Sequence, residues 1–170
     1  MGTGVVLDTS YLITLANPAR ENHDIARRYW RHFMDSQTPV FLPTIVVSEF
    51  YVRQEIPPDI LRCCVVLPFN WDDARKAAEL GFDQLKSKTE SRDALKDDVK
   101  IIAQAAVCGA GYLITDDVRT MYLSAEALRT AGKVQFAAIK LEGGFDRAAF
   151  EKGQGCFNGL LDETEAEGDV

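Results

Sequence analysis

Short apolar runs alternate with longer amphipathic stretches along most of this chain, and this alternation restricts the folds that it can adopt. Five runs have the length and apolar character of buried strands, at residues 4–8, 39–42, 63–67, 112–115 and 135–139. Strands that alternate with helices pair in parallel, because each helix carries the chain back to the edge of the sheet where the next strand begins. The sequence therefore predicts an α/β fold built on a parallel sheet.

The stretches between the predicted strands have the periodicity or the end signals of helices. We expect helices over residues 10–16, 24–34, 44–54, 71–85, 93–108 and 124–130, and a short one over 147–152. The 170 residues, 46% of them hydrophobic, are enough to form one core. We expect a single domain over residues 1–142, followed by an extension over 143–170 whose acidic end is disordered.

The net charge of −7 argues at first sight against a polyanionic partner. However, the last ten residues hold five acids and no Lys or Arg, so the rest of the chain carries −2 (−7 minus −5). No apolar run approaches the ~18 residues that span a membrane, and the N-terminus lacks the basic and apolar regions of a signal peptide. We therefore expect a cytoplasmic protein with no membrane partner, whose body remains open to nucleic acid.

Several common catalytic and metal-binding motifs are missing from the sequence. The cysteines form no C-x-x-C pair and neither histidine lies in a suggestive context, which argues against structural zinc and against Cys-His or Ser-His-Asp catalysis. Neither a P-loop nor a G-x-G-x-x-G turn is present. We expect buried, reduced thiols at Cys63, Cys64, Cys108 and Cys156.

Acidic residues stand out because several of them interrupt apolar segments. Asp8 ends the first predicted strand, and ligands of open α/β sheets bind beyond the carboxyl ends of the strands. The alternative is an aspartate that caps the following helix. Glu49 shares a helical face with Ile45, Val46 and Val52, where a carboxylate is costly to bury without a cation or hydrogen bonds. A helix that turns Glu49 to its solvent-exposed edge is the alternative there.

The helix predicted over residues 93–108 distinguishes two adjacent acids. Asp98 belongs to an apolar stripe, whereas Asp97 lies next to the polar side of the helix. The stripe is formed by Ala94, Leu95, Ile101, Ile102 and Ala105, and the polar side by Lys96, Lys100 and Gln104. An ionised aspartate in an apolar stripe is unusual, and a metal site explains it; a buried aspartate bonded to a nearby N–H is the alternative. We expect Asp98 to face inward and Asp97 outward.

Asp116 and Asp117 directly follow the fourth predicted strand, at the same edge of the sheet as Asp8, and either one could cap the next segment. Carboxylates gathered at one edge repel one another unless a cation neutralises them. Their all-oxygen donor set suits Mg²⁺ or Mn²⁺, ions that activate water and stabilise the leaving oxygen of a phosphodiester. A Rossmann-like phosphohydrolase that cleaves small phosphoesters would share such an edge.

Three segments, VLDTSYLI, FLPTIVVSEFYV and LKDDVKIIAQAAVCGAGYLITDD, closely resemble the PIN-domain nucleases, which include the VapC-like toxins of bacterial toxin–antitoxin pairs. The most specific part is D-x-x-I-x-x-x-A, followed by a Gly-rich turn, a strand and T-x-D. The resemblance covers residues 5–139. It implies a PIN-like three-layer α/β/α fold with a central parallel sheet of about five strands, and a nuclease domain over residues 1–142.

The resemblance also implies a metal site formed by four acids, Asp8, Glu49, Asp98 and Asp117, with Asp116 as the alternative to Asp117. Small polar residues that hydrogen-bond the acids in the family are matched by Thr9, Ser10 and Thr115. The implied activity is a Mg²⁺- or Mn²⁺-dependent endoribonuclease that cleaves RNA with metal-activated water. A homodimer and a small antitoxin are the implied partners. An RNA-processing role and a non-catalytic PIN-fold module that binds RNA or protein stay open.

Basic residues lie near two of these acids. Lys96 and Lys100 flank Asp98 within a basic stretch that begins at Lys86, and Arg119 follows T-x-D. We expect Arg119, Lys96 and Lys100 to contact RNA phosphates, which would make binding sensitive to salt. A solvated helix face, with acids interleaved among the lysines, is the alternative interpretation.

Overall fold

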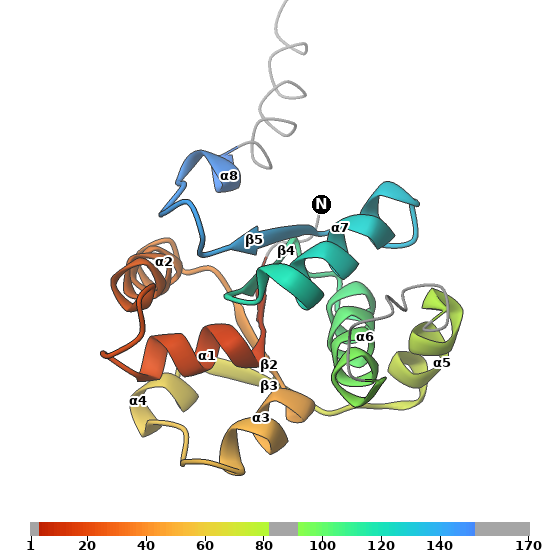
Figure 1. The fold of residues 1–170 in the computed structure, drawn as a ribbon, viewed down its shortest axis with the longest axis horizontal. Coiled ribbons are helices and arrows are strands. Elements are labelled where there is room, and N and C mark those ends of the chain that lie inside the picture. Colours follow the sequence, from red (N-terminus) through yellow and green to blue (C-terminus); the bar gives the residue numbers. More distant parts are fainter. Residues whose placement is uncertain (1–3, 82–91, 152–170) are drawn as a thin grey trace, which may run out of the picture.

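A computed structural model describes residues 4–81 and 92–151, and its centre is a sheet of five parallel strands (Figure 1). In the order of the sheet, the strands are β3 (Cys64–Leu67), β2 (Val40–Pro43), β1 (Val5–Leu7), β4 (Tyr112–Thr115) and β5 (Ala137–Lys140). Every neighbouring pair is parallel. The predicted parallel sheet is confirmed. Strand β5 begins two residues later than predicted, since its pairing with β4 starts at Ala137, opposite Tyr112.

The helices between the strands form the outer layers of the fold. They are α1 (Thr9–Ala16), α2 (His23–Asp35), α3 (Thr44–Tyr51), α4 (Pro58–Leu61), α5 (Trp71–Leu80), α6 (Arg92–Val107), α7 (Leu123–Thr130) and α8 (Ala148–Glu151), with a π-helical turn, η2 (Val118–Tyr122), before α7. In Figure 1 the sheet passes between α1 and α2 on one side and α5 and α6 on the other. This is the three-layer α/β/α arrangement that the resemblance implied.

The sheet supplies the middle of the core. All three residues of β1 are fully buried, and so are Leu113 and Ile114 of the adjacent β4. On one face, the Tyr11 hydroxyl of α1 donates to the Ala26 carbonyl oxygen of α2 over 3.0 Å. Because helices cover both faces, the central strands are apolar throughout and do not alternate between apolar and polar residues.

Helix α6 is buried on two sides, because it packs against both α5 and the sheet. Gln104, which we predicted on the polar side of this helix, is 1% exposed and donates from Nε2 to the Leu67 carbonyl oxygen over 3.1 Å. That prediction was wrong, since a helix with two buried faces keeps only a narrow polar strip. Lys96 is exposed and Lys100 partly exposed, as expected.

Strand β1 is preceded by a glycine that close packing requires. Gly4 has φ +122°, and a Cβ atom there would meet Cε2 of Phe41 at 2.6 Å and the Pro39 carbonyl oxygen at 3.1 Å. On its other side, the Gly4 carbonyl oxygen accepts a hydrogen bond from the Tyr112 N–H over 3.1 Å. A residue without a side chain therefore lets β1 enter the sheet tightly between β2 and β4.

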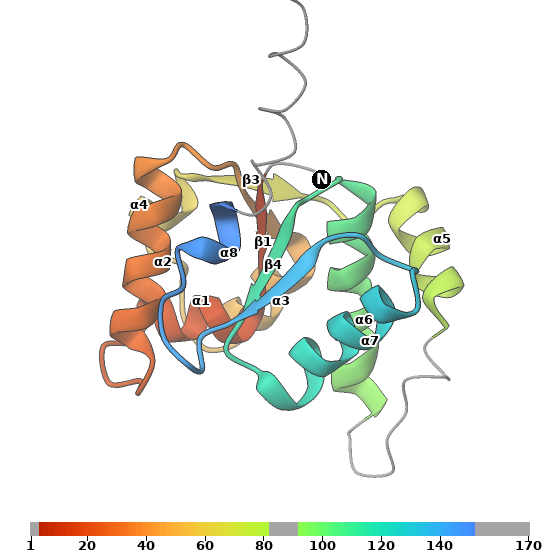
Figure 2. The ribbon, with the colours of Figure 1, turned by 90° about the horizontal axis from the view of Figure 1, so that it is seen from above.

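The segment after β5 turns back toward α2 (Figure 2). The Phe145 ring packs edge-on against Tyr29, with ring centroids 4.8 Å apart. The Tyr29 hydroxyl donates to the Gly144 carbonyl oxygen over 3.2 Å and accepts from the Asp146 N–H over 3.1 Å. Residues 143–151 thus cover part of α2. The domain boundary after residue 142 stays a prediction, and the acidic tail lies outside the described residues.

Of the cysteines that the structure describes, Cys63 is exposed, Cys64 and Cys108 are partly exposed, and all three are free thiols. The prediction of burial was wrong for Cys63, because this residue directly precedes the edge strand β3. Cys156 lies outside the described residues. Within residues 4–81 and 92–151, no helix has the length and apolar character needed to cross a bilayer.

Candidate metal centre

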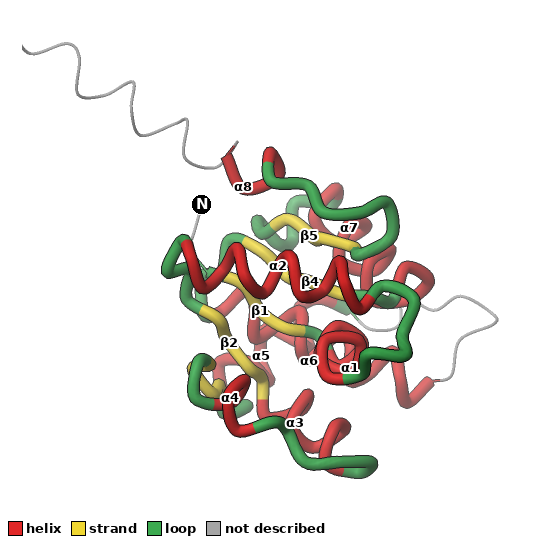
Figure 3. The backbone as a smooth tube through the Cα atoms, turned by 90° about the vertical axis from the view of Figure 1, so that its left-hand side faces the viewer, coloured by secondary structure: helices red, strands yellow, loops and turns green. Residues whose placement is uncertain are grey.

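The strand order reverses between β1 and β4, which are adjacent in the sheet although they are far apart in the sequence. Figure 3 shows β4, β1 and β2 side by side, with α1 at the end of β1. A reversal of this kind leaves a crevice beyond the carboxyl ends of the two strands, where ligands of open α/β sheets bind. Asp8 follows β1, and Asp116 and Asp117 follow β4, so these acids flank the crevice.

Asp8 is held by two hydroxyl groups from the two sides of this reversal. Ser10 Oγ donates to Asp8 Oδ2 over 2.5 Å, and Thr115 Oγ1 donates to the same oxygen over 2.7 Å. Each hydroxyl in turn accepts a backbone N–H over 2.9 Å, Ser10 from Asp116 and Thr115 from Asp117. Because a hydroxyl has a single hydrogen, this chain of bonds fixes both hydroxyls as donors to Asp8.

Burial sets the electrostatic state of Asp8. The residue is 4% exposed, and burial raises the pKa of its carboxyl group, although the Ser10 and Thr115 hydroxyls oppose this shift. Asp8 also caps α1, since Oδ2 accepts from the Ser10 N–H over 3.4 Å. The capping alternative for Asp8 and a ligand role are therefore compatible, because the cap and both hydroxyls use the same oxygen.

Glu49 reaches the same region from α3. The Thr9 hydroxyl, at the start of α1, donates to Glu49 Oε2. Partial burial raises the pKa of Glu49, the Thr9 hydrogen bond lowers it, and the charges of Asp97 and Asp8 raise it further. Glu49 is thus neither fully exposed nor deeply buried, and it lies close enough to Asp8 for the two carboxylates to repel each other.

Asp98 on α6 is the least satisfied of the four acids. Within the described part of the chain, its Oδ2 atom is buried and has no hydrogen-bond partner. Burial raises the pKa of Asp98 to about 8, with further contributions from the negative charges of Asp8, Asp117 and Glu49; a Thr120 hydrogen bond opposes the shift. Asp98 is therefore the residue whose ionisation is opposed by the charges of the other three acids.

The neighbouring Asp97 has a different environment. Its Oδ1 atom accepts from Lys100 Nζ over 2.8 Å, one helical turn away, in a partly exposed ion pair. Asp98 thus carries the unpartnered buried oxygen and Asp97 the surface ion pair, which is the arrangement that the helical stripe predicted.

Asp117 begins the π-helical turn η2. Its Oδ1 atom accepts from the N–H groups of Arg119 and Thr120 over 2.9 and 3.0 Å, and the Thr120 hydroxyl donates to Oδ2. These bonds orient the Asp117 carboxylate from its backbone side, and its charge still acts on Asp98.

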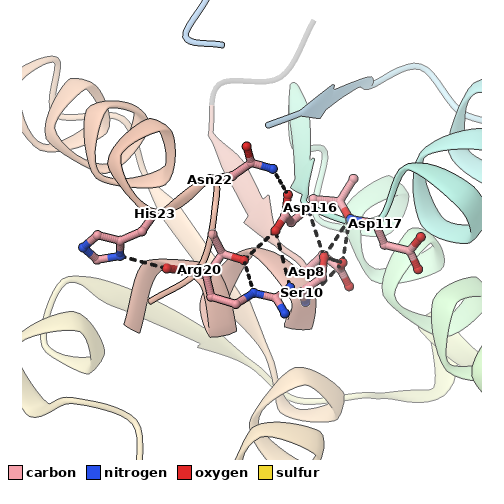
Figure 4. A network of polar contacts seen from close by, with 9 residues as sticks. Asp8, Ser10, Arg20, Asn22, His23, Asp116 and Asp117 are labelled. Carbon is pink, nitrogen blue, oxygen red and sulfur yellow. Dashed lines mark hydrogen bonds and ion pairs between the residues drawn. The ribbon is translucent and has the colours of Figure 1, made fainter. Parts of the chain in front are cut away.

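Asp116 points to the other side of the same turn (Figure 4). Its Oδ2 atom accepts from the buried Thr14 hydroxyl over 2.6 Å and lies 3.6 Å from Nη2 of Arg20, while Oδ1 accepts from Asn22 Nδ2 over 2.7 Å. Both oxygens of Asp116 are therefore engaged with α1 and the loop that follows it. Of the two adjacent acids, Asp117 is the one whose charge is coupled to Asp98.

The donor set fits a divalent cation in kind and in charge. Mg²⁺ and Mn²⁺ prefer carboxylate oxygens, and a buried carboxylate oxygen without a hydrogen-bond donor is a position that a cation would stabilise. Within residues 4–81 and 92–151, however, no three Asp, Glu, His or Cys side chains are grouped closely enough to hold an ion. The acids thus interact electrostatically, but they do not form a complete metal-coordination site in this structure.

The predicted RNA-contacting residues lie around this region in different states. Arg119 and Lys96 are exposed, and Lys100 is partly exposed and forms an ion pair with Asp97. The basic stretch that leads into α6 begins among residues 82–91, which lie outside the described residues.

Sequence reasoning missed two groups of residues at this edge. Thr120 bonds Asp117 and acts on Asp98, and the spacing D-x-x-T, which is typical of helix caps, was the available signal. Arg20 and Asn22 contact Asp116 from a loop, and no periodic pattern in the sequence indicates such a contact.

No family model matches the sequence, and no curated protein matches it. Solved structures are similar to it in fold. VapBC2 from Rickettsia felis, bound to a promoter DNA fragment, is 13% identical with a TM-score of 0.54, over 79% of this chain and 97% of that chain. FitAcB from Neisseria gonorrhoeae is 17% identical with a TM-score of 0.57, over 82% and 99%. VapC20 from Mycobacterium tuberculosis, a toxin that cleaves the sarcin–ricin loop, is 17% identical with a TM-score of 0.50, over 79% and 99%.

Proposed function

From the VapC-like PIN-domain fold of this chain, we propose that it is a Mg²⁺- or Mn²⁺-dependent endoribonuclease and the toxin of a toxin–antitoxin pair. The observation that carries the proposal is the coupling of four carboxylates at the strand reversal, with an unpartnered buried oxygen on Asp98. Such an arrangement is unfavourable for a chain that binds no cation, because it leaves buried like charges uncompensated.

In this proposal, the metal-binding and catalytic acids are Asp8, Glu49, Asp98 and Asp117. Asp117 is preferred to Asp116, whose two oxygens already accept bonds from Thr14 and Asn22. The bound ion would supply an activated water and stabilise the leaving oxygen of the phosphodiester. The protein's own hydroxyls orient the acids, and these are Thr9, Ser10 and Thr115. Arg119, Lys96 and Lys100 are the proposed RNA contacts.

The partners that we propose are an RNA substrate, a small antitoxin and a second copy of the chain, in the cytoplasm. Support for the antitoxin comes from the similar structures of VapBC2 from Rickettsia felis and VapBC from Salmonella typhimurium, both bound to DNA. Sedimentation of the purified chain at several concentrations tests the homodimer. Co-expression with the product of an adjacent short reading frame tests the antitoxin.

The direct test is cleavage of RNA by matched variants. We expect the wild type and Asp97→Asn to cleave RNA in Mg²⁺ or Mn²⁺, and Asp98→Asn to lose more than about 100-fold of the rate. Asp97→Asn is a matched control, because it makes the same chemical change one residue away. Mapping the cut sites by RNA sequencing would identify the substrate. Equal cleavage by wild type and Asp98→Asn, in preparations free of other nucleases, would contradict the proposal.

A non-catalytic PIN-fold module that binds RNA or protein is the second candidate. It predicts that Mg²⁺ and Mn²⁺ leave the melting temperature unchanged, and that RNA or protein binding survives when all four acids are made neutral. The uncompensated Asp98 carboxylate argues against it, because binding alone gives no reason to gather acids.

A further inference from the structure

Asp116 belongs to a second polar network that the proposed metal site does not use (Figure 4). Its side chain is only 9% exposed, and it accepts from the Thr14 hydroxyl and the Asn22 amide. The network continues to His23, whose Nδ1 atom lies 3.0 Å from the Thr14 carbonyl oxygen. A largely buried carboxylate with these partners fixes the loop between α1 and α2 against the turn that carries Asp117.

Arg20 is the cation that this network holds. Its Nη2 atom lies 3.6 Å from Asp116 Oδ2, and its Nε atom donates to the Thr14 hydroxyl oxygen over 3.4 Å. The side chain nevertheless remains 47% exposed. A guanidinium has five N–H donors, and these two contacts are long, so Arg20 keeps donors that face solvent. Because the guanidinium is about half exposed, its pair with Asp116 contributes more to the position of Arg20 than to stability.

The position of Arg20 follows from the bonds around it. Thr14 lies one helical turn beyond Ser10 on α1, and Ser10 bonds both the Asp8 carboxylate and the Asp116 N–H. Arg20 is therefore connected to Asp8 through Asp116 and Ser10, on the side of the crevice away from α6. A polyanionic substrate that approaches four acids is repelled, and an oriented guanidinium beside them offsets this repulsion.

We propose that Arg20 binds a phosphate of the RNA backbone beside the scissile bond, and that Asp116 is a positioning residue that holds Arg20 there. This inference rests on the proposed ribonuclease function and adds a substrate contact on the α1–α2 side. It also gives Asp116 a role that is distinct from metal binding.

The test measures RNA binding in the cleavage-deficient Asp98→Asn background, with a random single-stranded RNA oligonucleotide, Mg²⁺ and a series of salt concentrations. Arg20→Gln is expected to weaken binding on the order of tenfold at low salt and to reduce the slope of log affinity against log salt by about 0.7. Arg20→Lys keeps the charge and is expected to restore the slope. Asp116→Asn is expected to weaken binding in the same direction as Arg20→Gln, because it frees the guanidinium.

The matched control is Arg62→Gln, which removes the same charge from the residue that follows α4, before the amino end of β3 and away from the carboxyl ends of the strands. This variant is expected to bind RNA like its parent. Melting temperatures should be similar for Arg20→Gln and Arg62→Gln, because each guanidinium is about half exposed or more, and Asp116 keeps its bonds from Thr14 and Asn22 when Arg20 is replaced. Equal affinity and salt slope for these two variants, alongside RNA cleavage by the wild type, would overturn the inference. The inference would also be overturned if Arg20→Gln lost the binding of a co-purified antitoxin but kept the RNA affinity of its parent. Failure of the wild type to cleave RNA would instead reject the proposed function.

Discussion

Asp8 and Asp98 are both carboxylates withdrawn from water, but the structure compensates them unequally. Asp8 receives two hydroxyl donors on one oxygen. Asp98 has one buried oxygen with no donor among the described residues, and it experiences the charges of three other acids. In the metal-free protein, the ionised form of Asp98 therefore lacks the hydroxyl donors that Asp8 receives on one oxygen.

This difference predicts how the stability of the metal-free protein depends on pH. The pKa of Asp98 is about 8 in the folded state, against an ordinary value of 3.8. Because the pKa of Asp98 is raised in the folded state, protonation of Asp98 stabilises the folded protein fully at a pH below the ordinary pKa. This contribution is lost as the pH rises toward 8. Asn at position 98 cannot ionise. In EDTA at pH 8, Asp98→Asn is therefore expected to melt about 3–6 °C above the wild type, with the difference vanishing near pH 4.

Thermal unfolding followed by circular dichroism between pH 4 and pH 9 checks this prediction. Asp97→Asn serves as the control, since Asp97 is paired with Lys100 at the surface. Saturating Mn²⁺ should reverse the order, because only the wild type gains stability from the bound ion. A wild-type melting temperature that stays above that of Asp98→Asn at every pH in EDTA would contradict the assignment.

The hydroxyls around Asp8 give a second prediction at this scale. Thr115→Val keeps the shape of the side chain but removes the donor to Asp8 Oδ2 and the acceptor for the Asp117 N–H. Metal affinity is expected to fall about 10–100-fold, as it does when groups that orient metal ligands are lost. Isothermal titration with Mn²⁺ measures the change. The exposed Thr130→Val variant should bind like the wild type.

The sequence predicted which way a side chain faces where a single helix determines its direction. The stripe on α6 separated Asp98 from Asp97 before any fold was known. It did not separate Asp116 from Asp117, because adjacent residues in a turn have no periodicity, and their directions depend on partners such as Thr14 and Asn22. It did not reveal Arg20 for the same reason.

At the scale of elements, the strands were predictable because they are short apolar runs with clear ends, and the longer helices because they have an apolar period and clear end signals. Helix α4 was not predicted, because the prolines at its start resemble a helix break, whereas a proline in the first turn can begin a helix. Helix α3 ends at Tyr51, before the predicted end at residue 54. Helix α5 ends at Leu80, because Gly81 adopts a left-handed conformation with φ 73°.

The packing at the start of β1 gives a prediction for this scale. Gly4→Ala is expected to destabilise the protein by about 2–4 kcal/mol, because it combines an unfavourable φ with a clash against Phe41. Gly132→Ala is the matched control: it has φ +70°, but nothing lies within 4 Å of the added Cβ. It should cost only about 1 kcal/mol. Urea denaturation measures both, and equal losses would show that the clash is relieved without cost.

At the scale of the whole molecule, residues 143–151 join the end of the sheet to α2 through Tyr29, Phe145 and the bonds of the Tyr29 hydroxyl. This contact was not predictable, because the sequence assigned the segment to an extension and showed no pattern that indicates its partner. The domain division after residue 142 and the behaviour of the acidic tail stay predictions.

Tyr29→Phe tests how firmly this segment is attached. It preserves the ring contacts and removes only the hydroxyl that bonds Gly144 and Asp146, so the free energy of unfolding should fall by about 1 kcal/mol. RNA cleavage should be unchanged, since none of the four acids contacts this hydroxyl. Tyr51→Phe, at a 48% exposed position, is the control and should have no effect on stability. If Tyr29→Phe had the same free energy of unfolding as the wild type, these hydrogen bonds to the segment would add no stability.

The Thr115–Asp8 hydrogen bond joins residues 107 positions apart, so it forms only once β4 has paired with β1. During synthesis, a ribosome-bound chain that has emerged through α3 carries Asp8, Ser10 and Glu49, but it lacks the turn after β4 and the Thr115 hydroxyl that also bonds Asp8. In the proposed ribonuclease, the four acids therefore come together late, when nearly all of the domain has emerged. The order of translation would thus delay the proposed activity until β4 has been made.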